Sequence, residues 1–592
     1  MKYFIINPIS YICNPAPVNG IPSVIGMLEN AGINVSFTDL NLKYINNMLS
    51  DTSIYNFINF YDSIKNKYNS NIDDIFQNYD KNKTKLHNAI RVVNLCKIIM
   101  RHKEYFFNYI LQCYAKNIIY SVCSSISSIS DCIEEQICSD LNSYRNFSES
   151  RNFSINIELL NKYFKLDIWD FKNFYEDEII KILDEKPDII GVSINNHKQL
   201  IPGLYFCFLL KKKTNTHINI GGSFFDTFYN QIENLSELFN YYFDSISVSN
   251  NSNTPIALAE YIKGNIPINK VPCLIYKQKY NQIVKNPFMK DSLLKNLPII
   301  SFTGFDKKQY LSLELVLPIY TSISCYWRKC IFCSCYDNPF QQKPVSQTVK
   351  EIETLSKKYD TKYFYFWDNS ISPAYLEEMA DILIKKHLDI KYSIFARLEK
   401  EFTGELLKKA KQSGCLMIYF GLDSASDRVL EYINKGITVK QAREVLINSH
   451  KAGIFNGLYL ILGHPTETVK DLKKDLHFIN RNKKYINVAI VSPETLFVNG
   501  SKIVKDYKKN KSLIITTQEQ RHEIYNKITS QFKYVDSHTV HNLIYLSKKG
   551  LNEYNNGLFF AKFILSSRFL FNLYLKYQIY KQKKLIKKRE KW

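Results

Sequence analysis

The chain has 592 residues, more than one hydrophobic core holds, so the sequence predicts about three domains. Its hydrophobic content of 45% is typical of a globular protein. The formal net charge of +22 would favour an anionic partner, yet Lys is abundant along the whole chain and forms no focused patch. Composition therefore argues against a dedicated nucleic-acid or membrane-surface protein.

The compartment is predicted from the absence of targeting patterns. No apolar run reaches the roughly 18 residues that cross a bilayer, and residues 1–7 lack the basic region of a signal peptide. We therefore expect a cytoplasmic protein. One concentrated basic run, residues 581–592, is predicted as a solvated tail, with an acidic peptide or RNA as the alternative partner.

The beginning of the chain predicts a parallel sheet. Lys2–Pro8 is a short apolar run ending in a turn signal, and it is predicted as a buried strand. A helix over Pro22–Asn30 and a second strand over Ile33–Asn41 follow. This order is typical of the first unit of a parallel α/β sheet.

A long segment then interrupts the sheet pattern. Residues 43–151 are rich in Asn, Lys, Ser and Tyr, with the apolar spacing of helices, and predict a helical insertion. Strands are predicted again at Asp188–Ser193, at residues 217–221 and at Phe243–Ser249, with a helix over Leu200–Lys213. Repeated units of this kind predict a doubly wound, Rossmann-like domain whose ligand lies across the carboxyl ends of the strands.

The segment 321–339 holds four of the chain's 13 cysteines: Cys325, Cys330, Cys333 and Cys335. Three thiolates on one short loop can each bind one iron of a cubic iron-sulfur cluster, because soft sulfur suits iron. The fourth iron then stays open to a small ligand. A structural zinc site would use two spaced Cys/His pairs, and no second pair lies nearby in the sequence. The remaining cysteines are scattered singly through apolar stretches, which argues against disulfides.

Strands and helices alternate regularly around and after this segment. A hairpin is predicted at Val271–Pro287, and a strand at Glu314–Ile319 leads into the cysteines. Later, Ser372 and Pro373 have the residue types of a helix cap and a first helical position. About 180 residues of alternation suit six strand-helix units, because an eight-unit barrel usually needs about 250 residues.

The cysteine segment resembles the cluster loop of the radical S-adenosylmethionine (SAM) superfamily, in which an aromatic residue commonly precedes the last cysteine. Phe332 precedes Cys333 in this way, and the resemblance implies that it contacts SAM. It also implies a [4Fe-4S] cluster on Cys325, Cys330 and Cys333. The commonest family spacing is three residues and then two, whereas here it is four and two, which leaves Cys335 as a substitute ligand.

Later loops resemble the SAM-binding stretches of the same superfamily. Asp368 in FWDNS matches a contact to the amino group of SAM, and Arg397 in FARLE matches a charged SAM-facing residue. Asp423 in FGLDSAS stands where glutamate is commoner. Gly463 and Glu467 lie in LGHPTET, which resembles a Gly-x-Pro-x-Glu-Thr stretch. The alternative role for Glu467 is capping of the next helix.

The N-terminal strand order resembles the cobalamin (B12)-binding domain that precedes many radical SAM domains. The resemblance implies that Ser193, Gly221, Gly222 and Ser249 face the corrin. No Asp-x-His-x-x-Gly motif follows the first strand, so no histidine is offered as a lower cobalt ligand. The alternative is a retained fold that binds no cofactor.

The resemblance implies a domain order. It consists of a cobalamin-binding-like α/β domain (1–270), a linker (271–310), a partial (βα)6 radical SAM barrel (311–493) and a mainly helical basic region (494–592).

The expected function is that of a radical SAM enzyme, which reductively cleaves SAM. The resemblance further implies a cobalamin-dependent methyltransferase acting on an unactivated carbon of a peptide or natural product, with flavodoxin or ferredoxin as electron donor. One alternative is an epimerase or cyclase that does not use cobalamin. Another is a zinc-stabilised basic protein that binds nucleic acid.

Overall fold

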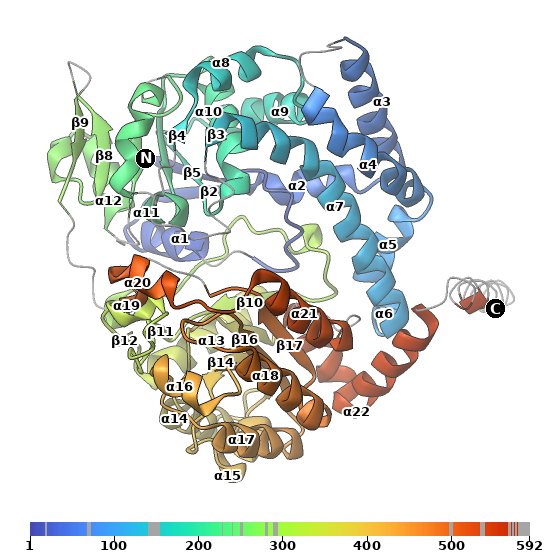
Figure 1. Cartoon of the computed structure of the whole chain (residues 1–592). Coiled ribbons are helices and arrows are strands. Elements are labelled where there is room, and N and C mark those ends of the chain that lie inside the picture. The colour runs from blue at the N-terminus through green and yellow to red at the C-terminus, as the bar shows by residue number, and fades with distance from the viewer. Residues whose placement is uncertain are drawn as a thin grey trace, which may run out of the picture.

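In the part of the chain that it describes, the computed structural model has two large sheets built mainly of parallel strands, one in each half of the chain, with helices around them (Figure 1). The N-terminal half is blue to green in Figure 1, and the C-terminal half is yellow to red. The structure describes residues 1–17, 20–67, 73–139, 154–227, 229–239, 241–248, 253–278, 282–287, 294–495, 501–532, 539–565, 570, 573–574 and 577.

In the described part of the chain, the first sheet has seven strands in the order β2-β1-β5-β6-β7-β8-β9. The first five in this order run parallel, and the hairpin β8–β9 adds antiparallel strands at one edge. Their bounds are β1 (Lys2–Asn7), β2 (Asn34–Asp39), β5 (Ile189–Ser193), β6 (His217–Gly221), β7 (Ser245–Ser247), β8 (Leu274–Lys277) and β9 (Ile283–Lys285).

Helices cover both faces of this sheet, so the predicted doubly wound domain is confirmed. Alternate residues of β1 enter different cores: Tyr3 and Ile5 pack with α1 and α12, and Phe4 and Ile6 with α9 and α10. The helix bounds are α1 (Gly20–Asn30), α9 (Lys172–Asp184), α10 (Leu200–Lys211) and α12 (Thr254–Ile262).

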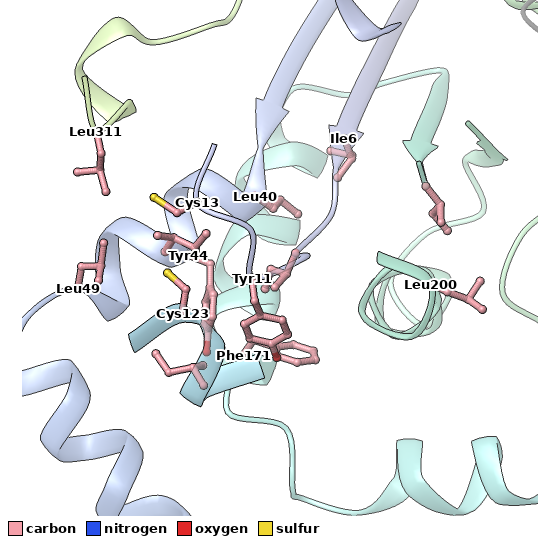
Figure 2. Close-up of a cluster of buried hydrophobic side chains, with 14 of the residues drawn as sticks. Ile6, Tyr11, Cys13, Leu40, Tyr44, Leu49, Cys123, Phe171, Leu200 and Leu311 are labelled. Atoms are coloured by element: carbon pink, nitrogen blue, oxygen red, sulfur yellow. The ribbon is translucent and has the colours of Figure 1, made fainter. Parts of the chain in front are cut away.

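The predicted insertion is mainly helical where the structure describes it, and the exception is the short strand β3 (Cys138–Ser139), which pairs with β4 (Ser154–Ile155). Its core is continuous with that of the sheet: Tyr11, in the loop after β1, lies against Tyr44 and Phe171, with ring centroids 5.9 and 6.5 Å away (Figure 2). Cys13 lies beside Cys123 in the same cluster. The helices are α2 (Leu40–Met48), α3 (Asp51–Lys67), α4 (Asp73–Ile90), α5 (Val93–Arg101), α6 (Lys103–Phe106), α7 (Tyr109–Ile137) and, after it, α8 (Ile157–Lys165).

Among the described residues, the second sheet has six strands, all parallel, in the order β10-β13-β14-β15-β16-β17. This confirms the six-unit partial barrel. The strands are β10 (Val316–Ile319), β13 (Tyr363–Phe366), β14 (Lys391–Arg397), β15 (Cys415–Asp423), β16 (Phe455–Ile461) and β17 (Val488–Ser492).

The outer face of this sheet is fully buried by helices. Phe366, Ile394, Phe420 and Leu458 are each 0% exposed in the core that these helices form. Ser372 accepts a hydrogen bond from the Tyr375 N–H, so the predicted helix start is confirmed. The helices are α13 (Val345–Tyr359), α14 (Pro373–Lys385), α15 (Gly404–Gln412), α16 (Asp427–Tyr432), α17 (Val439–Lys451) and α18 (Val469–Asn482).

The last helix closes the inner face of the second sheet at the amino ends of its strands. Tyr363 of β13 bonds the hydroxyl of Ser547, with an oxygen–oxygen distance of 2.9 Å, and Phe455 of β16 packs against Tyr554 at 5.3 Å. The Tyr554 hydroxyl also lies 3.0 Å from that of Tyr109 in α7. The C-terminal helices are α19 (Lys502–Lys505), α20 (Tyr507–Ser512), α21 (Gln518–Thr529) and α22 (Thr539–Leu565).

Two differences from the predicted elements have local causes. The second strand ends at Asp39 rather than Asn41, because the Asp39 carboxylate accepts a hydrogen bond from the Leu42 N–H and starts α2. The strand predicted over Phe243–Ser249 extends only over Ser245–Ser247, and Ser249 lies outside the described residues. None of the helices that the structure describes is long and apolar enough to span a bilayer.

Candidate active site

The cysteine loop is pinned at both ends. It follows β10, and its first residues form β11 (Ser322–Ile323), which pairs antiparallel with β12 (Gln341–Gln342). All four cysteines therefore lie in a closed loop at the carboxyl end of a parallel strand. Chemistry in barrel-like sheets is usually placed at this end.

Asp368 anchors the start of the loop. Its Oδ1 accepts hydrogen bonds from the Thr321 N–H at 2.9 Å and from the Ser322 N–H and hydroxyl, both at 2.6 Å. The Thr321 hydroxyl donates a further bond at 2.9 Å. Asp368 is 3% exposed. These contacts assign Asp368 a loop-fixing role, and its contact to the SAM amino group stays a prediction.

The structure brings the four thiols together. Cys333 donates its N–H to the Cys330 carbonyl at 3.2 Å, and the Cys335 N–H points to the Cys333 sulfur at 3.5 Å. Cys335 is buried, and the hydrogen bond from the Cys333 thiol lowers the pKa of the Cys335 thiol. Cys325 and Cys333 are half-buried.

The four cysteines of this loop are free thiols and offer sulfur donors. Within the described residues, no three His, Cys, Asp or Glu side chains converge tightly enough to hold one metal ion. Sulfur donors suit the soft irons of a [4Fe-4S] cluster. The choice among the four cysteines stays a prediction.

Arg397 lies against the cysteine loop, and each of its three guanidinium nitrogens contacts a protein acceptor. Its Nε donates to Glu399 Oε1 at 2.6 Å, Nη1 points to the Cys330 sulfur at 3.8 Å, and Nη2 donates to the Lys435 carbonyl. The guanidinium also lies 4.3 Å from the ring centroid of Trp327. Arg397 thus braces the loop, while its predicted contact with SAM remains a prediction.

A buried ion pair joins Asp423 to Lys435. The Lys435 ammonium donates to Asp423 Oδ2, and both side chains are less than a tenth exposed. Burial lowers the pKa of Lys435, but the negative charges of Asp423 and Cys330 outweigh burial and raise it. Local sequence reasoning missed Lys435, because a single Lys in a loop carries no periodic or spacing signal.

Removing one member of this pair should be costly. Lys435→Met leaves the Asp423 charge buried without its partner, so we expect the free energy of unfolding to fall by about 3 kcal/mol. Urea unfolding of the single variants and of Lys435→Met/Asp423→Leu measures the coupling. The double variant should recover most of the loss, and strictly additive losses would contradict the ion pair.

The loop after β16 is closed by Glu467. Its Oε2 accepts the Gly463 N–H at 2.5 Å, and Gly463 has a φ of +79°, which favours glycine. The next helix, α18, is capped instead by Thr468 in a capping box with Asp471. The alternative that Glu467 caps this helix is therefore wrong.

Phe332, predicted to contact SAM, faces this loop. Its ring lies 5.4 Å from that of His464, which is 0% exposed. Burial lowers the pKa of His464 to about 4, so its imidazole is neutral at physiological pH. No local pattern in the sequence distinguishes His464.

Three of the residues predicted to face a corrin lie at the carboxyl ends of β5 and β6. Gly222 has a φ of +113°, and a Cβ there would lie 2.3 Å from the Ile194 carbonyl oxygen. Ser193 pairs with Gly221 in the parallel ladder. Nearby, Asn196 Oδ1 is buried without a donor among the described residues. The protein's own Ile194 backbone fills the space beside Gly222, which explains the glycine, and corrin contact stays a prediction.

The two sheets meet through loops at their carboxyl ends. Tyr320 follows β10, and its hydroxyl lies 3.3 Å from that of Ser23 in α1. Tyr365 of β13 donates its hydroxyl to the Pro17 carbonyl at 3.4 Å. Pro17 and Ser23 both follow β1, so the ligand edge of the first sheet lies beside the cysteine loop.

Residues 319–479 match the sequence model described as the Radical SAM superfamily. An uncharacterized methyltransferase of Pyrococcus horikoshii is 28% identical over 182 residues, which are 30% of this chain and 39% of that protein. The 4'-phospho-dehydrooxetanocin synthase of Priestia megaterium is 23% identical over 372 residues, covering 57% of this chain and 49% of its own length. This chain thus spans half or less of the length of these two relatives.

A solved structure matches over both sheets. The radical SAM methyltransferase TsrM of Kitasatospora setae, with cobalamin and a [4Fe-4S] cluster bound, has a TM-score of 0.50 and 13% sequence identity. The match covers 85% of this chain and 75% of TsrM. At this identity the likeness concerns the fold. Residues 319–479 thus match the radical SAM superfamily, and the arrangement of the two sheets resembles the fold of TsrM.

Proposed function

We propose that this protein is a radical SAM enzyme that holds a [4Fe-4S] cluster on Cys325, Cys330 and Cys333. It reductively cleaves SAM and, with cobalamin bound between its sheets, methylates an unactivated carbon of a peptide or natural product. The observation that carries this proposal is the position of the cysteine loop beside the ligand edge of the first sheet.

The protein's own residues position and shield the reacting groups. When bound, the cluster supplies an electron and cobalamin a methyl group, and the protein supplies orientation and exclusion of water. Asp368 holds the start of the loop, and Arg397 braces Cys330. Gly222 keeps the end of β6 free of a side chain.

Aromatic side chains on the inner face of the second sheet favour a substrate with an apolar group. Tyr365, Phe395 and Tyr459 are only half-buried, although their strand neighbours on the helix side are at most 4% exposed. Trp367, beyond the end of β13, is 57% exposed. Solvent therefore reaches these aromatic rings. Their faces favour contact with an apolar or planar group.

The cellular setting follows from this chemistry. A reduced cluster needs an electron donor, for which flavodoxin or ferredoxin is proposed. It survives best in a reducing compartment, which supports a cytoplasmic location. Nucleic acid and membrane have no role in this proposal.

Corrin binding tests the second cofactor. Anaerobically purified protein, reconstituted with iron, sulfide and hydroxocobalamin and then desalted, should keep a corrin absorbance band. Gly222→Ala should lose it by displacing Ile194, while SAM cleavage continues. Gly20→Ala is the matched control, since a Cβ there meets nothing within 4 Å.

Each other outcome has a definite meaning. SAM cleavage without corrin retention in the wild type would reject the methyltransferase and favour the epimerase or cyclase alternative. A protein that binds zinc but no iron and sulfide would reject the proposed function altogether.

A further inference from the structure

Two short helices of the C-terminal region lie against the cysteine loop. The Ile503 N–H in α19 donates a hydrogen bond to the Ile331 carbonyl at 2.9 Å. Ile503 is 1% exposed, and Phe332 packs against its side chain. Because Ile331 and Phe332 lie between Cys330 and Cys333 in the chain, α19 contacts the part of the loop that carries two of the proposed cluster ligands.

The second helix, α20, is fixed to the same surface. Asn510 donates its side-chain amide to the Ile503 carbonyl at 2.8 Å. The Leu513 carbonyl, just after α20, accepts the Thr466 N–H at 2.7 Å. The backbone of both helices is therefore held on the second domain.

The side chains that these segments expose are mostly cationic. The acidic residues of segments 328–338 and 501–516 are Asp337 and Asp506. They lie 3.1 Å from Lys505 and 3.9 Å from Lys509, in exposed ion pairs, which are weak. The exposed cations of the two segments outnumber these acids, and we call them the basic patch: Arg328, Lys329, Lys502, Lys505, Lys509 and Lys511.

The basic patch adjoins the cysteines directly. Lys329 precedes Cys330 in the chain, and the Lys505 ammonium lies 6.0 Å from the ring centroid of Tyr336, the residue after Cys335. The sequence spreads these cations over two distant segments, and the contact between α19 and the loop brings them together. A positive surface thus lies on the loop that would hold the cluster.

We propose that the basic patch is the docking surface for the electron donor, a small acidic protein that carries single electrons. This inference rests on the proposed function, which requires an electron at the cysteine loop. One electron leaves the reduced donor and enters the cluster, so the donor is oxidised and the cluster reduced by one electron each. No bond forms or breaks in this step.

A charged surface suits a partner that must arrive and leave repeatedly. Opposite charges steer the encounter and raise its rate, and the effect falls with ionic strength. Complexes of electron-transfer proteins are small and weak, burying less than about 1,200 Å². Ile515, three residues after α20, is 60% exposed and offers such a complex an apolar contact.

Charge reversal on the two helices tests the docking surface. Lys502→Glu/Lys505→Glu/Lys509→Glu is compared with the wild type, both reconstituted with iron and sulfide, at low ionic strength. The Kd for oxidised flavodoxin should rise about tenfold, because the positive field that attracts an acidic protein is lost. The rate at which reduced flavodoxin bleaches the cluster absorbance should fall about tenfold as well. Excess dithionite, which needs no docking surface, should reduce the variant as fully as the wild type.

The matched control makes the same change in net charge elsewhere. Lys408→Glu/Lys440→Glu/Lys451→Glu alters exposed lysines of α15 and α17, at the far end of the second domain from α19 and α20 (Figure 1). This control should bind flavodoxin and be reduced by it as the wild type is. High salt should weaken flavodoxin binding by the wild type and the control, and change it little in the patch variant.

Each contrary result has its own meaning. Equal flavodoxin binding and equal reduction in the patch variant and the control would overturn the docking surface. If the patch variant instead lost only the binding of poly(U) RNA, the basic patch would be a nucleic-acid surface, and the proposal would also be wrong. Reduction that depends on the patch, in a protein that leaves SAM intact, would keep the docking surface and reject the proposed function.

Discussion

Replacing Cys325, Cys330 and Cys333 together by Ala should remove bound iron and sulfide and abolish reductive SAM cleavage. In the proposed ligand set each of the three thiolates binds one iron, and no other cysteine cluster of this kind occurs among the described residues. Iron and sulfide per chain, and 5'-deoxyadenosine formed after reduction, are measured on anaerobically purified protein. The loss of activity should exceed 1,000-fold, since the cofactor carries the chemistry.

Two single variants make this result specific. Cys96→Ala alters a fully buried thiol in α5 and should keep both iron and activity. Cys335→Ala decides the open question about the fourth cysteine. Full iron content in this variant would leave Cys335 as a buried neighbour of Cys333, whereas loss of iron would make it a ligand. A triple variant that still cleaves SAM would reject the cluster assignment.

Asp368→Ala should have the second largest effect. The substitution leaves the Thr321 and Ser322 donors buried without their acceptor, so we expect the free energy of unfolding to fall by about 3 kcal/mol. The start of the cysteine loop also loses its anchor. Iron content per chain should then drop several-fold even at temperatures where the protein stays folded.

The control separates loop anchoring from the loss of a charge. Asp389→Ala removes an exposed aspartate whose partners are the surface lysines Lys362 and Lys391, and it should change stability by less than 1 kcal/mol. Urea unfolding and iron analysis are compared for both variants. An Asp368→Ala protein with normal iron content would show that the loop forms without this carboxylate.

The fold could be predicted from the sequence because strands and helices leave periodic patterns of apolar residues. Apolar runs of strand length alternate with helical spacing from Glu314 onward, and caps such as Ser372 mark where helices begin. The insertion was predictable as helical for the same reason. Its packing on the sheet core through Tyr11 and Tyr44 was not, because that contact joins segments far apart in the chain.

The parts of the site in which residues of one type cluster in the sequence could be predicted. Hydrogen-bond and ion-pair partners from other segments of the chain could not. Four cysteines within one loop indicate soft-metal chemistry from spacing alone. Nothing local indicates that Asp368 holds that loop, or that Lys435 faces Asp423 across another. The first contact depends on the pairing of β10 with β13, and the second on the loop after α16 folding back onto the end of β15, which only the folded structure displays.

Product analysis after a single reductive turnover tests the central claim most directly. Wild-type protein reconstituted with iron and sulfide, given SAM and a strong reductant without oxygen, should form 5'-deoxyadenosine and methionine, and should form neither when reductant is omitted. The cysteine triple variant at the same concentration should form neither product. A wild-type protein that binds iron and sulfide at full occupancy yet leaves SAM intact would contradict the assignment of this loop to SAM cleavage.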